Sequence, residues 1–134
     1  MNLQEFLNEN DRFAKFAGAR LTEVREGYAR AELTVEAHHL NGGNVCQGGV
    51  LFTLADLAFA GVSNSTGVLT FGIENTITFV HSAKEGDHLT AEGRVSYEHP
   101  KIPFCEMKIH NQDGVLICCM TGLGYRKHQE IPKI

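Results

Sequence analysis

Residues 48–62 read GGVLFTLADLAFAGV, two glycines followed by a stretch that is almost entirely apolar. The stretch is too long for one strand, and its apolar residues recur at steps of three and four, which predicts a helix. The recurring positions are Leu51, Leu54, Ala55, Ala58 and Val62. Because this helix is apolar nearly all round, we expect it to be buried on most of its sides.

Strands are predicted on both sides of this helix. Residues 28–35 alternate between apolar and polar side chains, and residues 19–26 are expected to pair with them through a turn at Gly27. Four more strands are expected after the helix, and the Asp113-Gly114 pair is a strong hairpin signal between the last two. Their predicted ranges are 70–82, 88–98, 104–111 and 115–126.

The N-terminal residues 3–17 are predicted to form one amphipathic helix, whose apolar face includes Phe13. Asn2 can cap the start of this helix and Gly18 can end it. Residues 36–47 are expected to be a loop. The order of elements predicts an α+β fold in one domain, residues 1–134. Its mostly antiparallel six-stranded sheet curls around the long helix.

The composition excludes several classes of protein. The net charge of −4 argues against a nucleic-acid-binding protein, and no apolar run approaches the roughly 18 residues of a membrane helix. The four cysteines fit no disulfide framework and the N-terminus does not resemble a secretory signal, so a cytoplasmic location is expected. The 14 glycines exceed the usual share of about 7%, and four of them lie within residues 42–49.

Asp56 is the most informative residue of the chain. From Val50 to Ala60 the only other polar side chain is that of Thr53. An ionised carboxylate in apolar surroundings is costly unless it is paired, hydrogen-bonded or protonated. Asp56 is therefore either a structural residue bonded to a loop or a reactive carboxylate.

Gly48 and Gly49 favour the second interpretation. The first N–H groups of a helix have no intrahelical acceptor and carry partial positive charge, and glycine lets a substrate oxygen approach them closely. This arrangement is that of an oxyanion hole. Gly48 and Asp56 are, however, roughly 12 Å apart along a helix that rises about 1.5 Å per residue. We therefore expect a two-fold dimer with antiparallel copies of the helix, in which each site takes Gly48 from one subunit and Asp56 from the other.

Residues 41–60, NGGNVCQGGVLFTLADLAFA, resemble the signature of the hotdog-fold acyl-CoA thioesterases, and within that superfamily the phenylacetate-degradation (PaaI-type) branch. Residues 77–79 and 83–87 resemble the strand and turn that follow the helix in that family. The resemblance spans residues 10–127. It implies a sheet wrapped around the central helix and dimers that pair into tetramers.

The resemblance also implies roles for individual residues. The carboxylate of Asp56 would attack the thioester or activate water, and the sequence leaves both routes open. The N–H of Gly48, with Gly49 close by, would polarise the thioester carbonyl. Asn41 would hold water or substrate. Gln47 stands where the family commonly has a histidine, and it can hydrogen-bond but cannot titrate near neutral pH.

Two further residues are expected to contact the substrate. Thr76 lies on the strand after the helix, where members of the family use a serine or threonine to hold water. Lys84 could bind the phosphates of coenzyme A through charge-assisted hydrogen bonds. Coenzyme A is here part of the acyl-CoA substrate, and no metal or other cofactor is expected. Cys46 and the pair His38-His39 are interpreted as loop or core residues, because no base or ligand cluster accompanies them in the sequence.

Two alternatives keep the fold and change the function. Gln47 leaves open a non-catalytic module that binds or senses acyl-CoA. A dehydratase or hydratase ranks last, because that chemistry usually needs a histidine paired with a carboxylate and the central helix contains no histidine.

Overall fold

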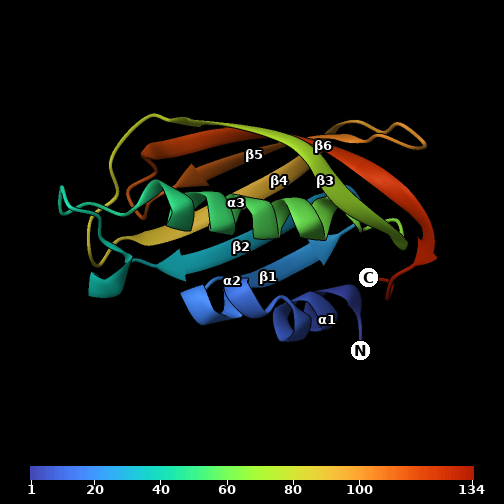
Figure 1. Ribbon diagram of the computed structural model, residues 1–134, viewed down its shortest axis with the longest axis horizontal. Helices are drawn as coiled ribbons and strands as arrows, with labels where there is room; N and C mark the ends of the chain where they lie inside the picture. The colour runs from blue at the N-terminus through green and yellow to red at the C-terminus, as the bar shows by residue number, and fades with distance from the viewer.

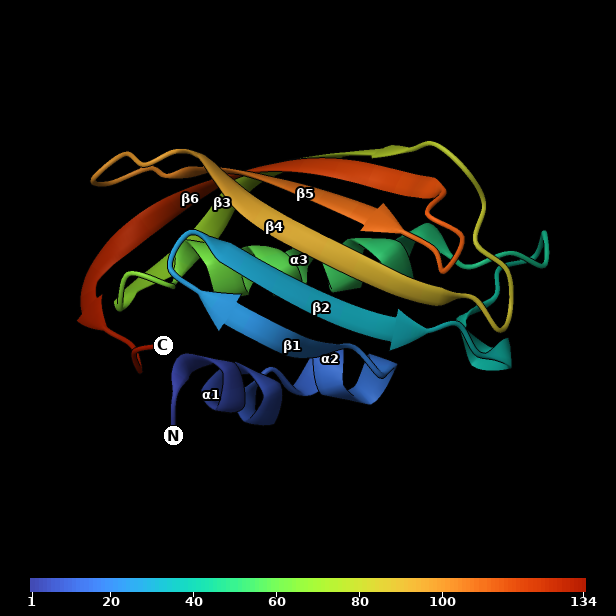
Figure 2. The same cartoon turned by 180° about the vertical axis from the view of Figure 1, so that it is seen from behind.

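One curled antiparallel sheet wraps around one long helix (Figures 1 and 2). The computed structural model describes all residues from 1 to 134. The sheet has six strands in the order β1-β2-β4-β5-β6-β3, and every pair of neighbours is antiparallel. The strands are β1 Arg20–Arg25, β2 Tyr28–Thr34, β3 Val68–Phe79, β4 His88–Tyr97, β5 Phe104–His110 and β6 Leu116–Glu130. The structure confirms the α+β prediction and the hotdog fold.

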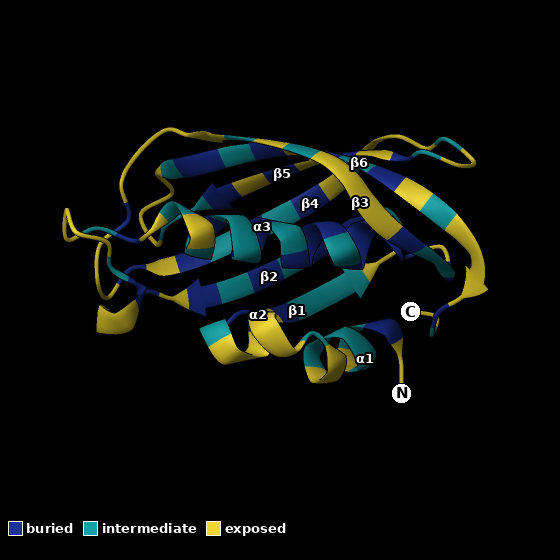
Figure 3. Cartoon of the chain, viewed as in Figure 1, coloured by how far each residue is buried: buried dark blue, intermediate teal, exposed yellow.

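The central helix α3, Gly48–Ser63, begins at the first of the two glycines. Its buried side, which includes Leu54 and Ala58, packs into a core formed with all the strands of the sheet. The prediction that α3 is buried on most sides is correct, but one stripe remains half-buried and faces away from the sheet (Figure 3). The stripe consists of Phe52, Thr53, Asp56 and Ala60.

Close packing of α3 against the sheet explains Gly61. A Cβ atom at this position would lie 2.8 Å from Cβ of Ala29 and 3.0 Å from Cδ2 of Leu21. Real Cβ atoms do not approach each other so closely, so only glycine lets the helix come this near to β1 and β2.

The predicted helix over residues 3–17 is wrong in one respect, because the chain forms two helices, α1 Leu3–Asn10 and α2 Arg12–Ala17. Asp11 interrupts them with a non-helical backbone (φ −80°, ψ 84°), and its carboxylate accepts a hydrogen bond from the N–H of Ala14 at 3.1 Å. Aspartate competes for backbone N–H groups in this way and so favours helix starts over helix interiors. The predicted ends are correct, since Asn2 caps α1 and Gly18 ends α2 at φ +91°.

The break also changes which aromatic residues are buried. Phe13, predicted to lie on the apolar face, is 67% exposed, and Phe16 is 84% exposed. The reason is that α2 is a separate short helix that buries Ala14. Both phenylalanines therefore lie on the surface of this chain.

Most strand predictions are correct to within a few residues. Gly27, at φ +78°, turns the chain between β1 and β2 as expected. β3 ends at Phe79, three residues before the predicted end, and β6 continues to Glu130. The loop over 36–47 contains one short 3-10 turn, Ala37–His39, and a single bridge between Leu40 and Cys46. None of the helices has the length and apolar character needed to span a membrane.

Candidate active site

The N-terminus of α3 offers free hydrogen-bond donors. The side chain of Gln47, the residue before the helix, makes no capping hydrogen bond. The N–H groups of Val50 and Leu51 both donate to the carbonyl oxygen of Gln47, at 3.0 and 3.4 Å. The N–H groups of Gly48 and Gly49 have no intrahelical acceptor, and they lie at the positive end of the helix dipole.

A hollow of about 360 Å³ lies at this end of α3. Its lining includes Asn41, Gly48, Phe79, His81 and Ser82. The ring of Phe79 covers Gly48 so closely that a Cβ there would lie 2.9 Å from its Cζ. Asn41 and Gly48, both predicted from the sequence, therefore lie in one hollow.

The side chain of Asn41 is partly used by its own loop. Its Oδ1 accepts hydrogen bonds from the N–H groups of Gly43, at 2.8 Å, and Val45, at 3.3 Å. This turn fixes the side chain, which is exposed, and leaves the Nδ2 group as its free donor. Asn41 can therefore donate hydrogen bonds to a ligand.

Gln47 is exposed, and its amide oxygen lies directly beside Gly49. A Cβ at Gly49 would lie 2.5 Å from this Oε1 atom. Any side chain at position 49 would therefore displace the amide of Gln47, which lies beside the first turn of α3.

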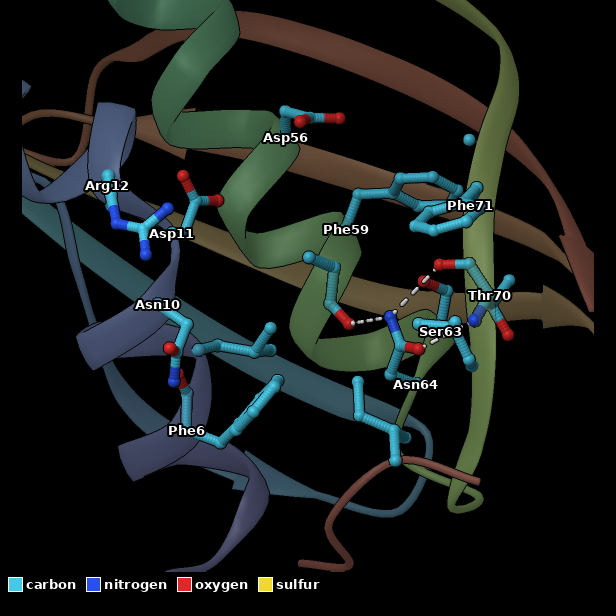
Figure 4. Close-up of a pocket in the computed structure, with 15 residues that line it drawn as sticks. Phe6, Asn10, Asp11, Arg12, Asp56, Phe59, Ser63, Asn64, Thr70 and Phe71 are labelled. Atoms are coloured by element: carbon cyan, nitrogen blue, oxygen red, sulfur yellow. Dashed lines mark hydrogen bonds between the residues drawn. The ribbon is translucent and has the colours of Figure 1, made fainter. Parts of the chain in front are cut away.

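Asp56 lies in a different and larger hollow, of about 590 Å³ (Figure 4). The hollow is bounded by α3, by the junction of α1 and α2, and by the start of β3. Its lining includes Asp11, Arg12, Phe59, Ser63 and Phe71. Asp56 projects into it from the half-buried stripe of α3.

The carboxyl group of Asp56 is poorly solvated. Burial raises its pKa, and the negative charge of Asp11 raises it further. No hydrogen bond from the protein lowers it. A carboxylate that projects into a hollow with a raised pKa and no hydrogen bond from the protein is a candidate reactive group.

Within one chain the N–H group of Gly48 and the carboxyl group of Asp56 remain apart. Gly48 and Asp56 belong to different hollows, and their eight-residue separation on α3 corresponds to about 12 Å. One reacting carbonyl cannot contact both groups of the same helix.

The two predicted substrate contacts lie elsewhere. Thr76 is exposed on β3, opposite Thr121, and it points away from α3 because its neighbours Asn75 and Ile77 face the helix side. Lys84 is exposed in the turn before β4, two residues after Ser82 of the smaller hollow. Lys84 is therefore near the Gly48 end of α3, and Thr76 lines neither hollow.

The other candidate groups have structural roles. Cys46 is buried, and burial raises the pKa of its thiol to about 11, so it is a poor nucleophile. Both ring nitrogens of His39 are occupied, since Nδ1 accepts from the N–H of Glu36 at 2.9 Å and Nε2 pairs with the carbonyl oxygen of Ala17 at 2.7 Å. Glu36, His38 and His39 lie close enough to share an ion, but His39 has no free nitrogen to offer.

The sequence pattern did not single out the neighbours of Asp56. Asp11 was hidden inside an apparently continuous helix, although an aspartate before a short apolar segment is a typical helix start. Ser63 is almost fully buried in the same hollow, and its hydroxyl has no hydrogen-bond partner. Phe59 and Phe71 look like ordinary core residues in the sequence and carry no signal of their own.

Comparison with known proteins identifies similar chains. The family model described as Thioesterase superfamily matches residues 38–118. A predicted esterase from Archaeoglobus fulgidus is 39% identical over 130 residues, which cover 97% of this chain and 84% of that protein. The acyl-coenzyme A thioesterase PaaI of Escherichia coli is 36% identical over 118 residues, which cover 88% of this chain and 84% of the relative.

The fold agrees with these matches. The solved structure of the E. coli PaaI protein from the phenylacetic acid degradation operon superposes with a TM-score of 0.92 at 35% sequence identity. The superposition covers 95% of this chain and 92% of that one. The structural similarity therefore extends over nearly the whole chain.

Proposed function

This chain belongs to the thioesterase superfamily and is a thioester hydrolase, and from that premise we propose that it cleaves an acyl- or arylacyl-coenzyme A into the free acid and coenzyme A. A relative 36% identical is an acyl-coenzyme A thioesterase, which supports this substrate class. The observation that carries the proposal is the pair of reactive features on α3. One is the unpaired, half-buried Asp56, and the other is the free N–H groups at Gly48 and Gly49.

The active site is composed of two subunits. Two α3 helices that lie antiparallel about a two-fold axis bring the N-terminus of one next to Asp56 of the other. The half-buried stripe of α3 that includes Asp56 is the surface available for this pairing. β3 supports the pairing because it is an edge strand of the sheet, with Phe71 and Ile73 more than half exposed. Such dimers are proposed to pair further into tetramers, in the cytoplasm.

The chemistry uses only groups of the protein and a water molecule. The N–H groups of Gly48 and Gly49 hydrogen-bond the thioester oxygen and stabilise the negative charge that forms on it. In one route Asp56 takes a proton from water, the water oxygen attacks the carbonyl carbon, and the carbon–sulfur bond breaks as coenzyme A leaves with a proton. In the other route Asp56 itself attacks, coenzyme A leaves, and water hydrolyses the resulting anhydride.

Hydroxylamine distinguishes these two routes. An anhydride at Asp56 reacts with hydroxylamine to give a hydroxamate, which mass spectrometry detects on the peptide that contains residue 56. Its appearance under turnover supports nucleophilic attack, whereas hydroxylamine that attacks the acyl carbon instead releases the acyl hydroxamate and leaves Asp56 unmodified.

Three side chains position the substrate in the proposed complex. Asn41 donates its Nδ2 hydrogens to water or to the substrate, since its oxygen is engaged in the loop. Gln47 contacts the substrate beside Gly49, in place of the family's histidine. Coenzyme A extends past the Gly48 end of α3, where Lys84 binds one of its phosphates. Thr76 remains a prediction, since it would need contacts that the partner subunit brings to the outer face of β3.

Subunit complementation tests the composite site. Asp56→Asn and Gly48→Val each remove one half of it, and each variant alone is expected to be inactive. Coexpression of the two is expected to restore about a quarter of the wild-type activity, because half of the dimers are mixed and each mixed dimer has one intact site. A coexpressed sample that is no more active than either variant alone would contradict the proposal that the two subunits share each active site.

The substrate class is tested with a panel of aromatic and aliphatic acyl-CoAs. Release of free thiol is followed for wild type and for Asp56→Asn, and the variant is expected to lose about 10²–10⁴-fold in kcat. Tight binding of acyl-CoA without hydrolysis would favour the alternative of a binding or sensing module.

A further inference from the structure

Asp11 and Asp56 come from different elements and line the same hollow (Figure 4). Asp56 projects from α3, and Asp11 lies at the junction between α1 and α2. The position of Asp11 is fixed, because its carboxylate accepts a hydrogen bond from the N–H of Ala14 at 3.1 Å. The break in the N-terminal helix therefore places a second carboxylate in the hollow that Asp56 lines.

We propose that Asp11 is a positioning residue of the thioesterase site, whose negative charge controls the protonation of Asp56. This inference rests on the proposed role of Asp56 in hydrolysis. The two carboxylates have different surroundings. Asp11 accepts a hydrogen bond at the first turn of α2, whereas Asp56 lies half-buried on α3 without a hydrogen bond from the protein.

The other charged groups near Asp56 are few. The lining of the hollow contains three charged residues, namely Asp11, Arg12 and Asp56 itself. β3 contributes Leu69, Thr70, Phe71 and Gly72, none of which titrates, and the C-terminal segment contributes Ile131. Arg12 is exposed to solvent, which screens its charge. Burial is the first cause of the raised pKa of Asp56, and Asp11 is the charged neighbour that raises this pKa further.

The direction of the effect follows from the sign of the charges. A negative charge next to a carboxyl group disfavours its ionised form. Removal of the charge at Asp11 should let Asp56 ionise at lower pH, although burial continues to hold its pKa above the ordinary value. If ionised Asp56 is the reactive form, the acid limb of the pH–rate profile moves to lower pH by the same amount.

Asp11→Asn separates charge from structure, because asparagine caps a helix as well as aspartate does. The matched control is Glu9→Gln, which removes the same charge from an exposed position on α1, where Glu9 pairs with Lys15 at 3.7 Å. The full-length variants carry aspartate labelled with ¹³C at the carboxyl carbon, and the Asp56 signal is assigned by its loss in Asp56→Asn. NMR titration then measures the protonation of Asp56 directly, and thiol release gives the pH–rate profile.

In Asp11→Asn, the Asp56 titration is expected to move to lower pH while Tm stays close to that of wild type. Glu9→Gln is expected to titrate as wild type does. An unchanged Asp56 titration in Asp11→Asn, or an equal shift in Glu9→Gln, would overturn the proposal. If the titration moves and the acid limb of the rate does not, the coupling of the two carboxylates is real and the proposed catalytic role of Asp56 fails instead.

Discussion

Phe79 covers Gly48 at the start of α3, so closely that a Cβ atom on Gly48 would lie 2.9 Å from Cζ of the ring. The contact joins the end of the edge strand β3 to the first turn of the helix. Both residues line the hollow at this end of α3, and a side chain at position 48 would displace the ring.

Gly48→Ala is expected to lower activity more than Gly49→Ala. The added methyl group at position 48 pushes the Phe79 ring into the hollow, whereas at position 49 it displaces only the exposed amide of Gln47. The rise in KM is expected to be about tenfold for Gly48→Ala, which corresponds to about 1.4 kcal/mol. Steady-state kinetics with one acyl-CoA measures both variants. Equal losses in the two variants would contradict the role assigned to Phe79.

Asp56→Asn is expected to raise Tm at neutral pH even though it removes activity. Burial raises the pKa of Asp56 in the folded protein, so the folded chain binds this proton more tightly than the unfolded chain. The resulting stability is complete below the ordinary pKa of 3.8 and is lost as pH rises through the folded pKa. The amide cannot ionise, so the gain in Tm should be greatest at neutral pH.

The measurement is Tm of wild type and Asp56→Asn over a series of pH values. Asp113→Asn, in the exposed turn between β5 and β6, is the control for loss of a surface charge. An Asp56→Asn variant that is less stable than wild type at neutral pH would mean that the ionised carboxylate stabilises the folded chain.

Gly61→Ala is expected to reduce the free energy of unfolding by about 1–3 kcal/mol, the usual cost of overpacking a core. The new methyl group would meet Cβ of Ala29, which cannot rotate away, so α3 must shift from β2. Gly42→Ala is the matched control, because a Cβ there would meet nothing within 4 Å. Denaturant unfolding compares the two, and similar values would show that α3 can move from the sheet at little cost.

His39→Ala is expected to destabilise the chain by about 1–3 kcal/mol, because the N–H of Glu36 and the carbonyl oxygen of Ala17 lose a buried partner. His38→Ala should change the free energy of unfolding little, since His38 is exposed. Both values come from denaturant unfolding. A large effect at His38 and none at His39 would contradict the structural role of the buried ring.

Local patterns predicted most of the fold. Helix α3 was predictable because apolar residues at helical spacing leave a chain of this length few other structures. The hairpins were predictable because Gly27 and Gly114 adopt positive φ angles that other residues rarely adopt. The break at Asp11 was missed because the apolar spacing continues across it, while the hydrogen bond that causes it involves one side chain and one N–H group.

The candidate site likewise has features that follow from the sequence and features that follow only from the tertiary structure. The sequence by itself determined that a lone carboxylate, Asp56, follows two glycines on one helix, and that helix geometry keeps them about 12 Å apart. Only the tertiary structure decided that Phe79 covers Gly48, that Asn41 uses its oxygen within its own loop, and that Asp11 lies in the same hollow as Asp56. The physical reason is that spacing along a helix follows from local backbone geometry. Contacts between a loop, an edge strand and a helix depend instead on how the whole chain packs around its core.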